Sequence, residues 1–257
     1  MNRKVWSIFA GLCLLAMSAL AFAQAPEEVK EKPPMYSYVA FWTLPRAQWA
    51  EMEKPNPTSQ KTLEKALAAG TLIGYGNDIN LIHQGEGSTH DSWWSSMSMA
   101  GVLNVLDDFH KNGSSGSPLL ASATKHSDGI FVSRFYNWHS GTWKDAYTHG
   151  ASYKLKPDAP DDAVSILSKH LFVPLLEKLL ADGSILEYEI DTEAIHTETP
   201  GTIWVFYITP NAEGLDKANA AVRETMKMHP LSGPAFSSMV DFTAHRDYLA
   251  HTNATYK

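Results

Sequence analysis

The sequence is poor in cysteine and in positive charge. Its 257 residues include one cysteine, Cys13, which lies in an N-terminal apolar segment. Removal of that segment leaves no thiol, which excludes disulfides, thiol catalysis, iron–sulfur clusters and cysteine zinc sites from the mature chain. The 28 acidic residues outnumber 21 basic ones, so the protein has no electrostatic reason to bind nucleic acid or an anionic membrane.

The short motifs of common enzyme classes are also missing. The sequence contains no G-x-S-x-G nucleophile elbow, phosphate-binding loop or dinucleotide fingerprint. Neither H-x-H nor H-E-x-x-H occurs, so no local spacing indicates a metal site, and none is expected. No nucleophile stands beside a recognisable activating partner. Catalytic residues therefore cannot be assigned, and the sequence leaves open whether the protein is an enzyme.

The N-terminal segment, residues 1–23, has the order of a secretory signal peptide. Two basic residues precede an apolar run from Val5 to Leu20, and a small-residue A-x-A site ends at Ala23. We expect cleavage after Ala23 and a periplasmic or secreted protein without further membrane association; an uncleaved membrane anchor is the alternative. Residues 24–34 are charged and proline-containing, which predicts a flexible lead-in.

From Met35 onward the sequence contains an internal repeat. The segment GTLIGYGNDINLIH, residues 70–83, matches GSILEYEIDTEAIH, residues 183–196, in length and in the positions of Gly, Tyr, Asp and His. Directly upstream, LEKALAAG and LEKLLADG each predict an amphipathic helix that ends at a glycine. A strand is expected to follow each glycine.

The repeat extends in both directions. YVAFWTLPRAQW, residues 38–49, resembles VSRFYNWHSGTW, residues 132–143, and TKHSD, residues 124–128, resembles TAHRD, residues 243–247. Because matches in several segments keep one order, we predict a duplicated unit in which each copy reads strand, helix, strand, strand, helix, strand. The predicted copies span residues 35–126 and 127–257.

Strand, helix, strand taken twice is the ferredoxin-like motif, an antiparallel sheet with both helices on one face. The bare faces of two such sheets can pack together within one chain or between the chains of a homodimer. In this element order, LEKALAAGTLIGY and PLLEKLLADGSILEY resemble the dimeric α/β-barrel superfamily in its tandem or fused form. The resemblance implies an α+β fold with two tandem ferredoxin-like repeats, from about Met35 to Leu249.

That superfamily includes heme-degrading and quinone-forming monooxygenases, chlorite-dismutase-like heme proteins and stress-responsive proteins. None of their catalytic motifs matches positions in this sequence, so no catalytic residue is carried over. The resemblance therefore implies a fold and leaves heme open as a cofactor.

Strand alternation gives the first candidate site residues. Counting by twos places the terminal His83 and His196 at the end of an apolar, inward-facing side of each strand, which in the second copy includes Tyr188. Such a histidine either closes the sheet edge by bonding a loop carbonyl or acts as an acid, a base, or a ligand of a metal ion or heme. The opposite faces are expected to be solvated or flexible, and they carry Gly74, Gly76, Asp78 and Asn80 in one copy and Glu187, Glu189, Asp191 and Glu193 in the other.

The Thr-x-His-x-Asp motif supplies His126 and Asp128 in one copy and His245 and Asp247 in the other. Each aspartate either fixes the tautomer of its histidine or caps the end of a strand. Arg134 lies within a predicted strand, where a buried guanidinium must be paired with a structural carboxylate or an anionic ligand.

The adjacent Trp93 and Trp94 must point to opposite faces of a sheet, so that one contacts helices and the other the barrel interior. With the aromatic strands and the missing catalytic motifs, this favours a binding or stress-related module for a small apolar or aromatic molecule. The alternatives are a heme-dependent or cofactor-independent oxidoreductase and a structural subunit of a homo-oligomer. The candidate ligand-binding residues are His83, His126, Asp128, Arg134, Tyr188, His196, His245 and Asp247.

Overall fold

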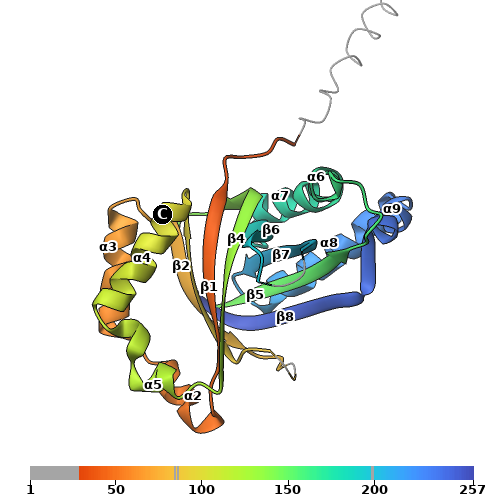
Figure 1. Cartoon of the computed structure of the whole chain (residues 1–257). Helices are drawn as coiled ribbons and strands as arrows, with labels where there is room; N and C mark the ends of the chain where they lie inside the picture. The colour runs from red at the N-terminus through yellow and green to blue at the C-terminus, as the bar shows by residue number, and fades with distance from the viewer. Residues whose placement is uncertain (1–28, 84, 86, 198–199) are drawn as a thin grey trace, which may run out of the picture. The chain divides into compact units, whose positions relative to one another are not determined.

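The computed structural model describes residues 29–83, 85, 87–197 and 200–257 (Figure 1). The predicted signal peptide lies outside the described residues. Residues 31–257 form one compact unit, and the unit before them, residues 1–30, is described only at its last two residues. Among the described residues, no helix combines the length and the apolar character needed to span a bilayer.

Strands and helices are interspersed along the chain in an α+β pattern, as the sequence predicts. The strands are β1 (Met35–Thr43), β2 (Gly74–Asn80), β3 (His90–Ser96), β4 (Lys125–Trp138), β5 (Gly141–Leu155), β6 (Glu187–Ile195), β7 (Thr202–Thr209) and β8 (Val240–Tyr256). The helices are η1 (Arg46–Gln48), α2 (Trp49–Met52), α3 (Pro57–Ala68), α4 (Met99–Lys111), η2 (Ser114–Gly116), α5 (Pro118–Ala121), α6 (Ala163–Leu167), the π-helical η3 (Ser168–Phe172), α7 (Val173–Ala181), α8 (Ala212–Met228) and α9 (Ser232–Met239).

The eight strands close into one antiparallel barrel in the order β1-β3-β2-β8-β5-β7-β6-β4. The first half of the chain supplies the neighbours β4-β1-β3-β2, and the second half supplies β8-β5-β7-β6, which is the same relative order. Two seams join these sheets, one between β2 and β8 and one between β4 and β6. Because every strand has two neighbours, the barrel has no free edge.

The strand that contains Arg134 differs from the sequence-based prediction. Residues 125–138 form a single strand, β4, so the expected boundary at residues 126 and 127 falls within it. The alignment of residues 38–49 with 132–143 is therefore wrong, because β4 follows the helices of the first half and pairs with β1. By its place in the barrel, β5 is the counterpart of β1.

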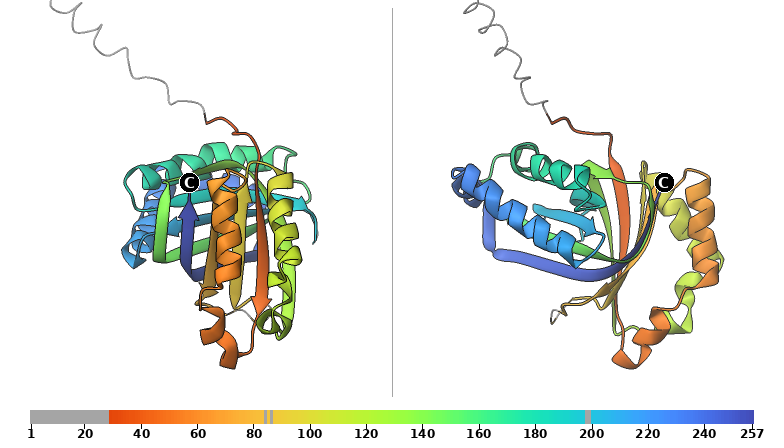
Figure 2. Two further views of the ribbon diagram at one scale, coloured as in Figure 1. Left: turned by 90° about the vertical axis from the view of Figure 1, so that its left-hand side faces the viewer. Right: turned by 180° about the vertical axis from the view of Figure 1, so that it is seen from behind.

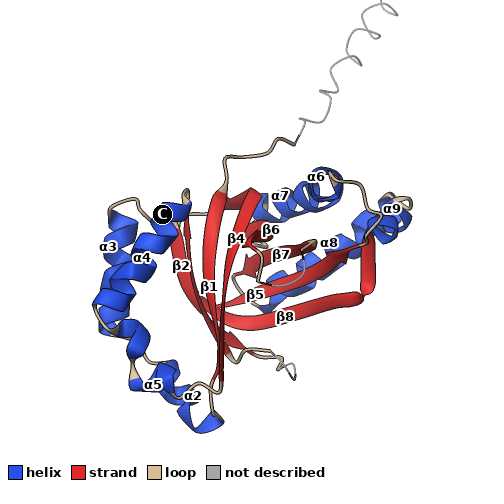
Figure 3. Ribbon diagram, viewed as in Figure 1, coloured by secondary structure: helices blue, strands red, loops and turns tan. Residues whose placement is uncertain are grey.

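The helices cover the outside of the barrel, as Figures 2 and 3 show. Helices α3 and α4 pack on the outer face of the first sheet, where Val102, Val105 and Phe109 of α4 meet Tyr38 and Trp94. The side chain of Asn56 caps the first backbone N–H groups of α3, and that of Ser98 caps α4. On the second sheet, α7 and α8 occupy the equivalent place (Figure 3).

Glycines end the two repeated helices as predicted. Gly70 follows α3 with φ 73°, and Gly183 follows α7 with φ 74°. Both values lie in the left-handed region that a side chain disfavours, so glycine reverses the chain there at little cost. Each turn leads into the strand that carries the repeated Tyr and Asp.

The end of the predicted flexible lead-in contacts the barrel. The backbone N–H of Lys32 donates to the carbonyl of Arg134 at 2.8 Å, and Lys32 Nζ donates to the carbonyl of Tyr136 at 2.6 Å. The hydroxyl of Tyr136 donates in turn to the carbonyl of Pro33 at 2.9 Å. Lys32 and Pro33 are therefore held along β4 by hydrogen bonds.

Candidate functional site

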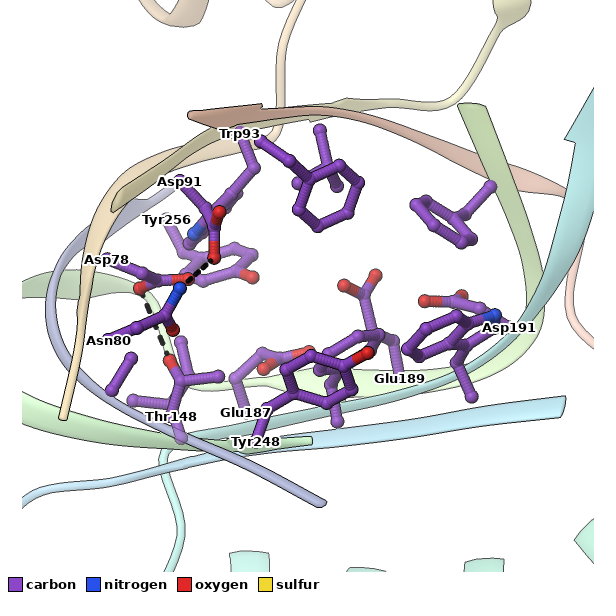
Figure 4. A pocket seen from close by; sticks show the side chains of 17 residues that line it. Asp78, Asn80, Asp91, Trp93, Thr148, Glu187, Glu189, Asp191, Tyr248 and Tyr256 are labelled. Atoms are coloured by element: carbon purple, nitrogen blue, oxygen red, sulfur yellow. Dashed lines mark hydrogen bonds between the residues drawn. The ribbon is translucent and has the colours of Figure 1, made fainter. Parts of the chain in front are cut away.

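The barrel interior contains a cavity to which all eight strands contribute side chains (Figure 4). The space within which the centre of a water molecule can lie has a volume of about 70 Å³. At roughly 10–15 Å³ for each water, this corresponds to about five to seven waters or an organic molecule of similar size. Its lining is Val39, Phe41, Asp78, Asn80, Asp91, Trp93, Phe131, Thr148, Glu187, Glu189, Asp191, Trp204, Phe206, Ile208, Tyr248, Ala250 and Tyr256.

Aromatic rings reach the cavity because glycines on β2 leave room for them. A Cβ on Gly76 would lie 2.4 Å from the ring of Trp93, and one on Gly74 would lie 2.5 Å from the ring of Tyr256. Both distances are shorter than any contact a real Cβ makes, so these rings lie directly over the backbone of β2. The two glycines expected on a solvated or flexible face are thus covered by aromatic side chains.

Two aspartates face each other on β2 and β3. Asp78 is paired in register with Asp91, and both are at least nine-tenths buried. Asp78 Oδ1 accepts a hydrogen bond from the Thr252 hydroxyl at 2.7 Å, and Asp91 Oδ2 accepts one from Asn80 Nδ2 at 3.0 Å. Burial, reinforced by the charge of Asp91, raises the pKa of Asp78 to about 7, and burial raises the pKa of Asp91 to about 6.

Three more carboxyl groups come from alternate positions of β6. Glu187 and Asp191 are 3% and 1% exposed, and Glu189 between them accepts a hydrogen bond from the Ser37 hydroxyl at 3.1 Å. Burial raises the pKa of Glu189 to about 7. Burial, followed by repulsion from neighbouring carboxylates, raises the pKa values of Glu187 and Asp191 well above the ordinary range. The face of β6 expected to be solvated is therefore the barrel interior, and that expectation is wrong.

No lysine, arginine or histidine stands among the described residues that line the cavity. Within the described structure, Asp91 Oδ1 and Asp191 Oδ1 are buried and have no hydrogen-bond partner. The indole N–H of Trp204 on the same wall is also unpaired there. Buried polar groups are normally satisfied, so these atoms lack the partners that a guest or ordered water would supply.

The histidines that end the two repeated segments lie outside the cavity. His83 follows the end of β2 by three residues and is exposed, with its ring 5.0 Å from that of Trp49. His196 follows the end of β6, is also exposed, and lines a separate pocket with Glu193 and Thr202. The prediction that both lie inward at the end of an apolar face is wrong, because each strand ends before its histidine.

The Thr-x-His-x-Asp motif of the first half forms a cluster on the outer face of the barrel. His126 Nε2 lies 3.0 Å from Asp128 Oδ1, and the His126 ring stacks on Trp42 with centroids 3.7 Å apart. The hydroxyl of Tyr38 donates to Asp128, and burial together with this bond raises the pKa of the tyrosine. The motif thus joins β4 to β1.

The second half repeats this arrangement between β8 and β5. His245 Nε2 lies 3.2 Å from Asp247 Oδ2, and the His245 ring stacks on Tyr153 with centroids 4.6 Å apart. His149 Nε2, 3.6 Å from Asp247 Oδ1, stands where Tyr38 stands in the first half. Burial lowers the pKa of His149 and raises that of Tyr153 to about 12. None of the four motif residues lines the barrel cavity.

The last two candidate ligand-binding residues, Tyr188 and Arg134, do not line the cavity. Tyr188 lies on the outer face of β6, 1% exposed, and its hydroxyl donates to Glu177 Oε1 of α7 at 2.6 Å. Arg134 is exposed at an irregularity in the pairing of β4 with β6, between Ser133 and Phe135. The expectation of a buried, paired guanidinium at Arg134 is wrong, because the bulge turns this side chain outward.

A metal ion and a heme each require a particular set of ligands. Across residues 29–257, apart from the four left undescribed, no group of three or more His, Cys, Asp or Glu side chains is arranged to hold a metal ion. A heme needs an axial ligand and a broad apolar slot. The cavity lining offers no histidine and a space far smaller than a porphyrin, so heme does not fit in the barrel interior.

Several solved structures share this fold at low sequence identity. A candidate monooxygenase from Fusobacterium nucleatum gives a TM-score of 0.64 at 7% identity, over 88% of this chain and 95% of that one. A candidate monooxygenase from Lactobacillus acidophilus gives 0.58 at 11%, over 88% and 97%. A heme-binding protein from Thermus thermophilus gives 0.52 at 11%, over 89% and 94%. No family model and no curated protein matches the sequence.

At these identities the likeness concerns the fold alone. The structural neighbours cover nearly the whole of the described chain, and the structure closes eight antiparallel strands beneath outer helices. The fold that the two helix–glycine–strand segments imply is thereby confirmed. The chain has the dimeric α/β-barrel fold.

Proposed function

We propose that this protein is a small-molecule binding protein whose ligand occupies the interior of the barrel. The observation that carries the proposal is the set of buried carboxyl groups, two of them with unpaired oxygens, inside a cavity walled by aromatic rings. Packed cores avoid such groups, because an unpaired buried carboxylate destabilises the fold. Buried groups that lower the stability of the fold are typical of functional sites, where binding or catalysis requires them.

An oxidoreductase is the second candidate, because structural neighbours include candidate monooxygenases and an anthrone oxidase-like protein. Asp78 and Glu189, with pKa values of about 7, are suited to exchange protons at neutral pH. Proton removal from a substrate would, however, create an anion beside several carboxyl groups, with no cation on the described walls. The electrostatics of the cavity therefore favour binding over this chemistry.

We also propose that the chain consists of two repeats and is exported. The two halves are two ferredoxin-like repeats, a reading supported by the equal strand order of the two sheets and the equivalent His–Asp clusters. The protein is exported by the N-terminal segment, which is cleaved after Ala23. Since both sheets belong to one closed barrel, binding needs one chain, and a homodimer would form through outer surfaces.

Fluorine NMR of protein labelled with 5-fluorotryptophan tests the proposal. Trp93 and Trp204 line the cavity, whereas Trp94 faces the helices and serves as the internal control. Titration with benzyl alcohol, benzylamine and benzoate should shift the Trp93 and Trp204 resonances in a saturable way and leave that of Trp94 in place. If no probe shifts either cavity resonance, the barrel interior is not a binding site for molecules of this size.

A further inference from the structure

We infer that the ligand of the barrel cavity is a small organic cation, a protonated amine whose ammonium group lies among the carboxyl groups and whose hydrocarbon part lies against the aromatic rings. The inference rests on the proposed binding function and names its ligand class. Three properties of the cavity support it: the sign of its charge, the nature of its walls and its size.

The charged groups of the cavity have one sign. Figure 4 shows Asp78 and Asp91 on one side and Glu189 and Asp191 on the other. Since the lining within the described chain contains no cationic side chain, the ionised carboxylates repel each other without compensation. A guest with a positive charge removes this repulsion, whereas a neutral guest leaves it and an anionic guest increases it.

The carboxylate oxygens that have no hydrogen-bond partner also favour a cationic ligand. In the described structure the atoms Asp91 Oδ1 and Asp191 Oδ1 have no hydrogen-bond partner, and both residues are at least nine-tenths buried. Carboxylate oxygens only accept hydrogen bonds when ionised, so each requires a donor. An ammonium group supplies up to three N–H donors together with the charge, and bonds of this kind are stronger than neutral ones.

The remaining walls suit the organic part of such a ligand. Trp93, Phe131, Trp204 and Phe206 border the cavity, and the Phe131 and Trp204 rings meet edge to face with centroids 5.8 Å apart. Aromatic faces attract cations, and tryptophan does so most strongly. The space of about five to seven waters matches a molecule of the size of benzylamine.

A metal ion fits these observations less well than an organic cation. No three acidic or histidine side chains in the described chain are placed to hold one. A metal ion would also leave the aromatic walls without a partner. The carboxyl groups and the rings together require a ligand with a charged end and an apolar body.

The experiment compares benzylamine with benzyl alcohol, which has nearly the same size and shape but no charge. Dissociation constants are measured at about pH 8, where benzylamine is still protonated, by the fluorine resonances of Trp93 and Trp204. We expect benzylamine to bind at least about tenfold more tightly than benzyl alcohol. Benzoate should bind more weakly than either.

Two single variants assign the preference to the carboxyl groups. Asp191→Asn and Asp91→Asn each remove one acidic group while keeping the side-chain shape, and each should lower the ratio of amine to alcohol affinity by about threefold or more. The matched control is Asp107→Asn on the exposed face of α4, which should leave the ratio unchanged. Using two cavity variants keeps the test decisive if one of them fails to fold.

The possible outcomes separate the inference from the proposed function. Equal binding of amine and alcohol overturns the inference but leaves binding in the barrel intact. Absence of binding by every probe overturns both. Displacement of benzylamine by millimolar sodium, calcium or magnesium, with the same resonance shifts, assigns the site to an inorganic cation and also overturns the inference. Preference for the amine that both cavity variants reduce supports it.

Discussion

Asp78 and Asp91 are direct cross-strand partners inside a barrel whose described lining contains no basic side chain. Like charges placed opposite each other in a sheet destabilise it unless one of them is neutral. The hydroxyl of Thr252 and the amide of Asn80 each satisfy one oxygen of the pair, but they supply no charge. The pair therefore binds protons more tightly in the folded protein than in the unfolded chain.

This relationship predicts that the free energy of unfolding falls as the pH rises from about 4 to about 7. In that window the folded Asp78, Asp91 and Glu189, with pKa values of about 7, 6 and 7, hold protons that the unfolded chain releases. Glu187 and Asp191 change stability in the same direction. Each group loses about 1.4 kcal/mol for every pH unit between its unfolded and folded pKa values. Between pH 5 and pH 8 the three groups with pKa values of about 7, 6 and 7 together correspond to about 7 kcal/mol, so urea unfolding should show a loss of several kcal/mol.

The control for this pH dependence is Asp78→Asn. It removes one of the groups with a raised pKa and should make stability fall less steeply with pH. A free energy of unfolding that stays level or rises across the window would contradict the account of uncompensated carboxyl groups.

Substitution of a cavity carboxyl group should stabilise the ligand-free protein. Asp191→Asn removes a 1% exposed acid while keeping a side-chain oxygen that can accept hydrogen bonds. We expect the free energy of unfolding at neutral pH to rise by about 1–3 kcal/mol. Chemical denaturation measures it, with Asp107→Asn as the exposed control. A loss of stability in Asp191→Asn would mean that the native carboxylate is already compensated.

The neighbouring tryptophans should separate binding from folding. Trp94 Nε1 donates to the Val102 carbonyl at 3.0 Å, so Trp94→Phe should cost about 1–3 kcal/mol of stability and leave benzylamine affinity unchanged. Trp93 borders the cavity, so Trp93→Phe should weaken benzylamine binding by about threefold or more. Thermal unfolding and titration of both variants check this, and similar effects of the two changes on affinity would refute it.

The Thr-x-His-x-Asp clusters should affect stability alone. His126→Gln removes the stack on Trp42, and His245→Gln removes the stack on Tyr153. Each change should lower the free energy of unfolding by about 0.5–1.5 kcal/mol. Benzylamine affinity should stay within about twofold of that of the unaltered protein. A large loss of affinity in either variant would move the binding site to the outer face.

The glycine beneath Trp93 should be sensitive to a single added carbon. A Cβ at position 76 would lie 2.4 Å from the Trp93 ring and 2.8 Å from the backbone carbonyl of Asn253. Gly76→Ala should therefore cost about 1–3 kcal/mol and weaken amine binding as the ring shifts. Gly116→Ala, which meets nothing within 4 Å, is the matched control. If both variants behave alike in denaturation and titration, Trp93 is not held over β2 as described.

The fold was largely accessible from the sequence because its signals are local. Helices closed by Gly70 and Gly183 lead into strands of equal pattern, and both glycines have the left-handed conformation that this pattern predicts. Trp93 and Trp94 point to opposite sides of the sheet, as strict alternation requires, with one in the cavity and the other against the helices. These features depend on a few adjacent residues.

The site is not predictable from the sequence, because burial on both faces of a strand cannot be read from the polarity of its residues. Glu187, Glu189 and Asp191 look like a solvated face, yet the second sheet closes over them. The sequence does contain one signal of the site, because Asp78 and Asp191 occupy the same position of the repeated segment. On a solvated face, no physical constraint would favour an aspartate at that position in both copies. The bulge at Arg134 and the early ends of β2 and β6 depend on pairing with distant strands, which local patterns do not reveal.

A crystal structure of the protein with benzylamine, at a pH where the cavity carboxyl groups are ionised, tests the central claim most directly. The account predicts one benzylamine inside the barrel, with its nitrogen within hydrogen-bond distance of Asp91 Oδ1 or Asp191 Oδ1 and its ring against Trp93 or Trp204. Benzylamine bound only outside the barrel, or an interior that holds water alone at saturating amine, would contradict it.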